Sequence, residues 1–190
     1  MDQLLSPDTL LRDIIFVAFD TETTGLVKHP NAPLAKQPRM IEFGAAVVDA
    51  KGKVTKKFKQ LVNPGEPLTD EITKITGISN DDLKGQPTFE KAWPKIFAFI
   101  KPAKMMLAHN EPFDRAIVDY ELKRASKKFV WPTSFCTISL YRAQWGRDMR
   151  LTELYENIIG KPLDQKHRAL SDVEALVEIV QKEKLWEALA

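Results

Sequence analysis

The sequence has almost no cysteine: Cys136 is the only one among 190 residues. One cysteine forms no intrachain disulfide, and no cysteine cluster is present to hold structural zinc. Disulfide scaffolds and cysteine-based zinc modules are therefore excluded. Because such sparse cysteine use is typical of a reducing compartment, we expect a cytoplasmic protein.

Long apolar runs are also missing. The densest run, Ile14 to Phe19, is far too short to cross a bilayer, so we expect no membrane partner. The first residues, MDQLLSPDTLL, lack the basic leader and apolar stretch of a signal peptide. The formal net charge is only +2, which is low for a nucleic-acid-binding protein. Two bound divalent cations would raise this charge to about +6 (+2 plus +4).

The length and the composition, with 44% apolar and 28% charged residues, favour a single globular domain over residues 1–190. We expect its core at about 14–184, preceded by an N-terminal extension at 1–13. A segment with three prolines and no periodicity, 28–38, is predicted to be an exposed insertion.

Five segments rich in apolar, β-branched and aromatic residues predict strands. They lie at 14–20, 40–49, 54–62, 105–108 and 135–137. The first three have connections too short for a crossover helix, so we expect an antiparallel meander, with parallel strands after it. The residues that follow the first strand, 21–26, are expected to form a loop.

Helical patterns separate and follow these strands. A short helix is predicted to open at Thr69 and to end at Gly77. A pattern at 88–100 contains Pro94, which predicts a kink or a late start. Further helices are expected at 112–127, 138–145, 151–159 and 169–186. Helices flanking a mixed, mostly five-stranded sheet define an α/β fold class.

Three short patterns supply four carboxylates and one histidine. They are Asp20-Thr21-Glu22, Asn110-x-x-x-Asp114 and His167-x-Ala169-x-x-Asp172. Acids that converge repel each other unless cations lie between them, and hard cations such as Mg²⁺ or Mn²⁺ prefer oxygen ligands. Two such ions form a common apparatus for cutting a phosphodiester, and a histidine beside the acids can take a proton from water. The patterns together predict a metal-dependent nuclease.

The segments that carry these residues resemble the three motifs of the DEDDh family of 3′→5′ exonucleases. They are FDTETTGL (19–26), HNEPFD (109–114) and HRALSD (167–172). The family includes the proofreading subunit of bacterial DNA polymerase III, and the resemblance covers about 14–184. It implies an RNase H-like fold and stepwise hydrolysis of 3′ ends to nucleoside 5′-monophosphates.

The resemblance also implies a role for each catalytic residue. Asp20 would bridge two divalent ions, Mg²⁺ or Mn²⁺. Glu22 and Asp172 would complete the shell of one ion, and Asp114 would help to hold the other. His167 would be the general base that accepts the proton of the attacking water.

A further set of residues is predicted to contact the substrate. By resemblance, the loop after Glu22 holds the terminal nucleotide, where Leu26 packs on the base and Gly25 lets the backbone approach closely. Phe113 would line the same pocket. The full predicted set is Thr23, Thr24, Gly25, Leu26, Asn110, Phe113 and Arg168.

Basic residues near the third motif are candidates for phosphate contacts, although a solvated face is their default interpretation. Arg168, next to His167, is preferred among them. The others are Arg142, Arg147, Arg150 and Lys166. His109 is expected to pack or to donate a hydrogen bond at a strand end, not to bind a metal.

Several functions share these motifs. The leading interpretation is an exonuclease that acts on 3′ ends of DNA, single-stranded or frayed, in replication, repair or proofreading. The alternatives are an exoribonuclease of the same fold and a non-catalytic module that binds nucleic acid or a polymerase. The expected partners are DNA or RNA 3′ ends and, for a proofreading role, a DNA polymerase or another replication or repair protein.

Overall fold

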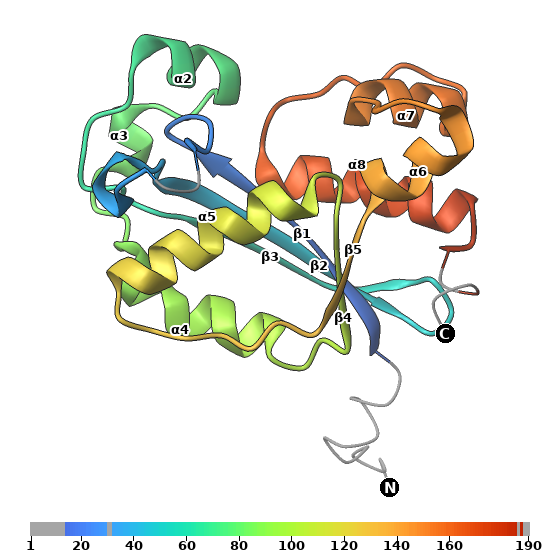
Figure 1. The fold of residues 1–190 in the computed structure, drawn as a ribbon, viewed down its shortest axis with the longest axis horizontal. Coiled ribbons are helices and arrows are strands. Elements are labelled where there is room, and N and C mark those ends of the chain that lie inside the picture. Colours follow the sequence, from blue (N-terminus) through green and yellow to red (C-terminus); the bar gives the residue numbers. More distant parts are fainter. Residues whose placement is uncertain (1–13, 30–31, 186, 188–190) are drawn as a thin grey trace, which may run out of the picture.

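The computed structural model describes residues 14–29, 32–185 and 187, so the predicted extension at 1–13 lies outside the described residues. Its centre is a five-stranded sheet in the order β3-β2-β1-β4-β5 (Figure 1). The strands are β1 (Ile14–Thr23), β2 (Met40–Asp49), β3 (Val54–Leu61), β4 (Met105–Ala108) and β5 (Thr133–Cys136). β1, β2 and β3 pair antiparallel, whereas β4 runs parallel to β1 and to β5. The predicted mixed sheet with its initial meander is confirmed.

Helices cover both faces of this sheet (Figure 1). α4 and α5 pack on one face, α6, α7 and α8 pack on the other, and α2 and α3 lie beside the end of β1. The helices are α2 (Asp70–Thr76), α3 (Asn80–Leu83), α4 (Phe89–Ile100), α5 (Glu111–Arg124), α6 (Thr137–Trp145), α7 (Leu151–Ile159) and α8 (Ala169–Lys182). None of the described helices is long and apolar enough to span a membrane.

The side chains of β1 alternate between the two helical layers. Val17 and Phe19 belong to the apolar cluster under α4 and α5, whereas Phe16 and Ala18 belong to the cluster under α7 and α8. Because a strand places every second side chain on the same face, Asp20 continues the row that faces α8. The apolar run of β1 is therefore buried on both faces, and its polar end presents acids toward α8.

The first strand is longer than predicted. Residues 21–23 belong to β1 and not to a loop, because pairing with β2 continues to Thr23, which is opposite Met40. The apolar run ends at Phe19, but backbone pairing in a sheet does not depend on apolar side chains. Asp20 therefore lies within a strand, where its position is fixed more firmly than at a strand end.

Several helix boundaries also differ from the predictions, and α5, for example, ends at Arg124 and not at 127. α4 begins at Phe89 with Pro94 inside it, so the predicted late start is wrong. The rings of Trp93 and Phe97, on either side of Pro94, pack with centroids 5.6 Å apart. α8 ends at Lys182, before the predicted end at 186, because Lys184 adopts a left-handed φ of 50°.

The proline-rich insertion is less exposed than predicted. It contains a 3₁₀ helix, η1 (Leu34–Lys36), and Gln37 and Pro38 are buried. Arg124 of α5 donates from Nη2 to the carbonyl oxygens of Leu34 at 2.8 Å and Gln37 at 2.7 Å. The sequence pattern could not show this, because the insertion is held through its backbone carbonyls.

Candidate active site

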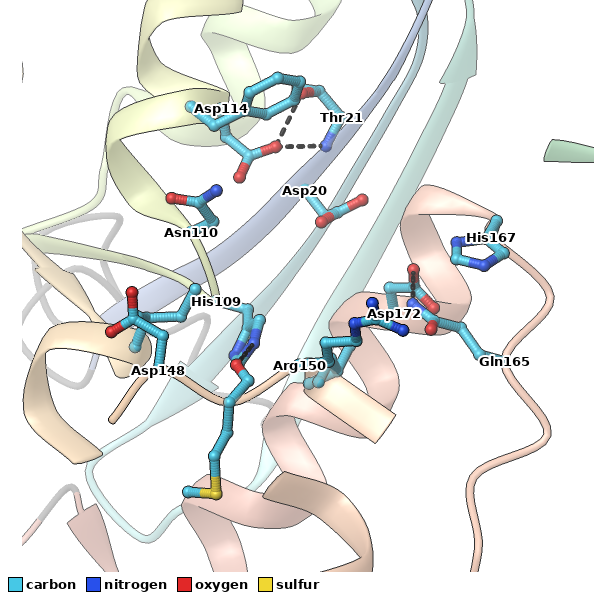
Figure 2. A pocket seen from close by; sticks show the side chains of 14 residues that line it. Asp20, Thr21, His109, Asn110, Asp114, Asp148, Arg150, Gln165, His167 and Asp172 are labelled. Carbon is cyan, nitrogen blue, oxygen red and sulfur yellow. Dashed lines mark hydrogen bonds between the residues drawn. The ribbon is translucent and has the colours of Figure 1, made fainter. Parts of the chain in front are cut away.

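Three parts of the fold bring the four acids of the motifs together. Asp20 and Glu22 come from β1, Asp114 comes from the first turn of α5, and Asp172 comes from the first turn of α8. α5 follows β4, the parallel neighbour of β1, so two strands deliver acids to the same edge of the sheet. Figure 2 shows Asp20, Asp114 and Asp172 around one cavity of about 560 Å³.

Asp114 is bound directly to β1. The backbone amide of Thr21 donates to Asp114 Oδ1 at 2.9 Å, and the Thr21 hydroxyl donates to the same oxygen at 2.7 Å (Figure 2). The aspartate is only 3% exposed. Both bonds use Oδ1, so Oδ2 can still bind a ligand from the cavity.

Asp172 is held from the segment before α8. Gln165 Nε2 donates to Asp172 Oδ2 at 2.8 Å. Glu22, His167 and Asp172 each place a ligand atom within 4.8 Å of the other two. His167 has a φ of 46°, a left-handed conformation that costs a non-glycine residue about 1–3 kcal/mol. This turn brings the imidazole beside two of the acids.

Burial raises the pKa values of all four acids, and repulsion among the four raises those of Asp20 and Glu22 further. Burial raises the pKa of Asp20 well above its ordinary value, and Asp114, Glu22 and Asp172 raise it further. The pKa of Glu22 is raised to about 9, by burial first and then by Asp172. Burial raises the pKa of Asp114 to about 7, although the hydrogen bonds from Thr21 lower it. Burial also raises the pKa of Asp172. Each shift disfavours the ionised form, and a bound cation would reverse that preference.

These four acids are not neutralised by basic side chains. Across the described part of the chain, no lysine or arginine forms a salt bridge with them, whereas the buried acids Glu42 and Glu121 are bound by arginines. The four offer carboxylate oxygens, which are the ligands that Mg²⁺ and Mn²⁺ prefer. The donor chemistry, the missing counter-charge and the raised pKa values therefore fit divalent cations.

His109 has a structural role at the edge of the same cavity. Its Nδ1 lies 2.9 Å from Thr137 Oγ1, and its Nε2 lies 3.0 Å from the carbonyl oxygen of Met149. These contacts connect the end of β4 to α6 and to the segment before α7. The expectation that His109 forms hydrogen bonds at a strand end is confirmed.

Arg150 extends into the cavity from the start of α7 (Figure 2). Two other arginines from the same region differ from it. Arg142 binds Asp148, and Arg147 binds Glu153, so their guanidinium groups have acidic partners within the protein. Arg150 is therefore the arginine of this region with the best access to a phosphate near the acids.

A second cavity, of about 570 Å³, lies next to the first and shares Thr21 and Phe113 with it. The predicted nucleotide-binding loop lines it, and so does α2, for which the sequence suggested no role. Leu26 is 75% exposed, and a Cβ at Gly25 would meet nothing within 4 Å. Glu22 lines this second cavity. The loop and α2 contribute Thr23, Thr24, Gly25, Leu26, Glu71, Ile72, Ile75 and Thr76.

The remaining predicted substrate residues have different surroundings. Asn110 lines the first cavity and precedes α5 without capping it through its side chain. Arg168 binds Glu42 with two hydrogen bonds, so the guanidinium predicted to contact a phosphate already has a partner in the protein. A phosphate contact by Arg168 stays a prediction.

Sequence reasoning missed two polar residues that support the site. Glu42 is an acid among apolar neighbours in the strand MIEFGAAVVD, and a charge in such surroundings indicates a buried partner. Gln165 lies in a segment without periodicity, so no sequence signal marks its bond to Asp172.

The sequence model described as Exonuclease matches residues 17–180. The DNA polymerase III subunit epsilon of Aquifex aeolicus is 34% identical over 183 residues, which cover 94% of this chain and 85% of that protein. The 3′-5′ exonuclease DinG of Bacillus subtilis is 33% identical over 173 residues, which cover 88% of this chain and 18% of DinG. A PolC-type DNA polymerase III of Halalkalibacterium halodurans is 34% identical, over 87% of this chain and 11% of that protein. The chain thus spans only a small part of the last two relatives.

Solved structures share the fold. The nuclease domain of 3′hExo, described as a DEDDh family member bound to rAMP, superposes with a TM-score of 0.73 at 18% identity, covering 90% of this chain and 91% of that chain. A 3′-exonuclease described in the recognition of a histone mRNA stem-loop gives a TM-score of 0.74 at 18% identity, covering 90% and 81%. The architecture is therefore RNase H-like. Motifs, sheet order and sequence matches agree, and the chain belongs to the exonuclease family, within its DEDDh 3′→5′ branch.

Proposed function

We propose that this chain, through one catalytic domain at about 14–184, removes nucleotides from the 3′ ends of DNA that is single-stranded or frayed. One observation carries the proposal: four carboxylates that form no salt bridge with a lysine or arginine of the described residues meet at the edge of the sheet, and His167 lies beside two of them. A phosphodiester is negatively charged, so it needs cations to bind beside carboxylates. A site of this kind therefore suits phosphodiester hydrolysis.

The proposed roles follow from the positions of the residues. Asp20, Glu22, Asp114 and Asp172 hold two divalent ions, Mg²⁺ or Mn²⁺. Bound there, the ions would lower the pKa of a water molecule and stabilise negative charge on the leaving 3′ oxygen. His167 takes a proton as the water oxygen bonds to phosphorus and the bond from phosphorus to the 3′ oxygen breaks. The released 3′ oxygen takes up a proton, and the product is a nucleoside 5′-monophosphate.

The two cavities suggest how a 3′ end is oriented. The second cavity, formed by residues 23–26 and α2, would hold the terminal nucleotide, with Leu26 and Phe113 against its base. Stacking of this kind gives little base preference. The first cavity, with Asn110 and Arg150 on its walls, would hold the scissile phosphate and its neighbour.

DNA is the preferred substrate because the relatives similar in sequence are named as a DNA polymerase III subunit and as DinG. RNA is the second candidate, since the similar solved structures are described with histone mRNA and with rAMP. The relation to the epsilon subunit also supports a polymerase as partner, in proofreading during replication or repair.

The test is digestion of 5′-labelled DNA and RNA oligomers of the same sequence with Mg²⁺. The wild-type protein should shorten single-stranded DNA stepwise from its 3′ end and act more slowly on RNA. Asp20→Ala and Asp172→Ala should lower the rate on the order of 1,000-fold, because each removes a ligand at the reacting phosphate. Folding of each variant is checked by thermal melting.

Glu174→Gln is the matched control, because Glu174 is an exposed acid of the same helix as Asp172 and pairs with Lys57. Its rate should equal that of the wild type. Cleavage that survives a chelator, or that persists in folded Asp20→Ala, would contradict the assignment. Tight DNA binding without any cleavage would favour the non-catalytic module.

A further inference from the structure

A buried ion pair outside the acid cluster joins β2 to the third motif. Glu42 is 0% exposed, and its carboxylate accepts a hydrogen bond from Arg168 Nη2 at 2.7 Å and one from Arg168 Nε at 3.0 Å. The backbone amide of Ala169, the first residue of α8, donates to Glu42 as well, at 2.9 Å. Arg168, the N-cap of α8, makes no capping bond with its own side chain, so a strand residue caps this helix.

The first turn of α8 lies directly on the backbone of β2. A Cβ added to Gly44 would be 2.4 Å from the carbonyl carbon of Ala169 and 2.4 Å from the amide nitrogen of Leu170. Gly44 is opposite Asp20 in the sheet, and Glu42 is opposite Glu22. The start of α8 is therefore fixed against β2, the neighbour of the acid-bearing strand β1, by a backbone contact at Gly44 and by the bidentate ion pair.

His167 is the residue directly before Arg168 in the chain, and it has the left-handed φ of 46°. Such a conformation persists only where the surroundings hold it. We propose that Glu42 and Arg168 are positioning residues, whose ion pair fixes the turn at His167 so that the imidazole stays beside Glu22 and Asp172. The inference rests on the proposed role of His167 as base and adds the residues that hold it in place.

The burial of Glu42 separates this role from a phosphate contact. Arg168 retains some exposure, with 32% of its side chain accessible, and by itself could serve either purpose. Glu42 has no access to a substrate, because its side chain is fully buried. A change confined to Glu42 therefore removes no phosphate contact. It also removes a negative charge that raises the pKa values of Asp20, Glu22 and Asp172, so the variant has to be compared with and without the imidazole of His167.

The kinetic test compares Glu42→Gln and Arg168→Lys with the wild type. Each should lower kcat about tenfold or more and leave KM within about twofold, because a misplaced base affects the chemical step. In a His167→Ala background, Glu42→Gln should cost less than about twofold, since the imidazole that it positions is gone. Glu174→Gln, which removes the exposed ion pair of α8 with Lys57, should have no effect in either background.

A second measurement does not depend on activity. The imidazole ¹⁵N signals of the three histidines are recorded by NMR. The His167 signals should form one set in the wild type and should shift or broaden in Glu42→Gln, while those of His29 and His109 stay in place. If Glu42→Gln does not fold, Arg168→Lys serves instead, because it keeps both charges and loses the bidentate contact.

Three results would overturn the positioning role. They are unchanged kcat and unchanged His167 signals in both variants, a loss that persists in full in the His167→Ala background, and a rise in KM confined to Arg168→Lys, which would indicate a phosphate contact. A wild-type protein that cleaves no 3′ end refutes the proposed function instead, and the NMR comparison still decides whether the ion pair holds His167.

Discussion

The two acids supplied by helices are held in different ways on the two sides of the sheet. On the α5 side, Asp114 accepts two bonds from Thr21, one of them from the backbone of β1. On the α8 side, Asp172 accepts a bond from the side chain of Gln165, which lies in an irregular segment. The Asp114 carboxylate is therefore bound through the backbone of the sheet, whereas the Asp172 carboxylate is bound by a side chain from a loop. We expect substitutions on the loop side to cost more activity.

Among the variants that leave the metal-binding acids in place, the largest effect is expected for His167→Ala, on the loop side. General base catalysis contributes about 100-fold to 10,000-fold, so kcat should fall at least about 100-fold. Single-turnover digestion of single-stranded DNA near neutral pH measures the loss. A loss below about tenfold would show that His167 is not the base. Substitutions on the loop side would then no longer be expected to cost more activity than those on the α5 side.

The next comparison removes one donor from each side. Gln165→Leu should lower kcat about tenfold, because it removes a side-chain bond to an ionised carboxylate. Thr21→Val should lower kcat only about threefold, since the amide of Thr21 still donates to Asp114. Initial rates at saturating DNA measure both. Equal losses, or a larger loss for Thr21→Val, would contradict the difference between the two sides.

A smaller effect is expected for Arg150→Ala. If Arg150 contacts a phosphate, KM should rise about fivefold with kcat nearly unchanged, and KM should depend less steeply on salt. The matched control is Arg142→Ala, because Arg142 already binds Asp148. Equal changes in the two variants would indicate a general loss of positive charge and not a contact in the cavity.

The smallest effect concerns stability without cations. Glu22, with a pKa of about 9, and Asp114, with a pKa of about 7, bind more protons when folded than when unfolded, where such groups titrate near about 4. The unfolding free energy should therefore fall as pH rises from about 5 to 9, and Tm should fall with it.

Differential scanning fluorimetry with a chelator, compared with Glu22→Gln, isolates this contribution. The variant should lose part of the pH slope, and Mn²⁺ should raise the Tm of the wild type more at pH 9 than at pH 6. A slope that is the same in both proteins would mean that Glu22 is ionised in the cation-free site.

The sequence predicted more of the fold than of the contacts. The strand at Met40–Asp49 and the helix at Leu151–Ile159 have the predicted bounds, because apolar periodicity and caps act locally. The end of β1 was misjudged, since pairing with a distant strand extends it through polar residues. A local sequence pattern indicates which side chains of a segment are buried. It does not indicate which distant strand pairs with the backbone of that segment.

The sequence by itself determined which residues are proposed for the chemistry: three spaced motifs that supply four acids and one histidine. Only the tertiary structure decided how these groups are held. It pairs Arg168 with Glu42, Gln165 with Asp172 and Thr21 with Asp114, and it places α8 on Gly44. The physical reason is that packing brings together groups that are far apart in the sequence. The strength of each contact depends on burial and on distance, and neither can be read from the spacing of residues along the chain.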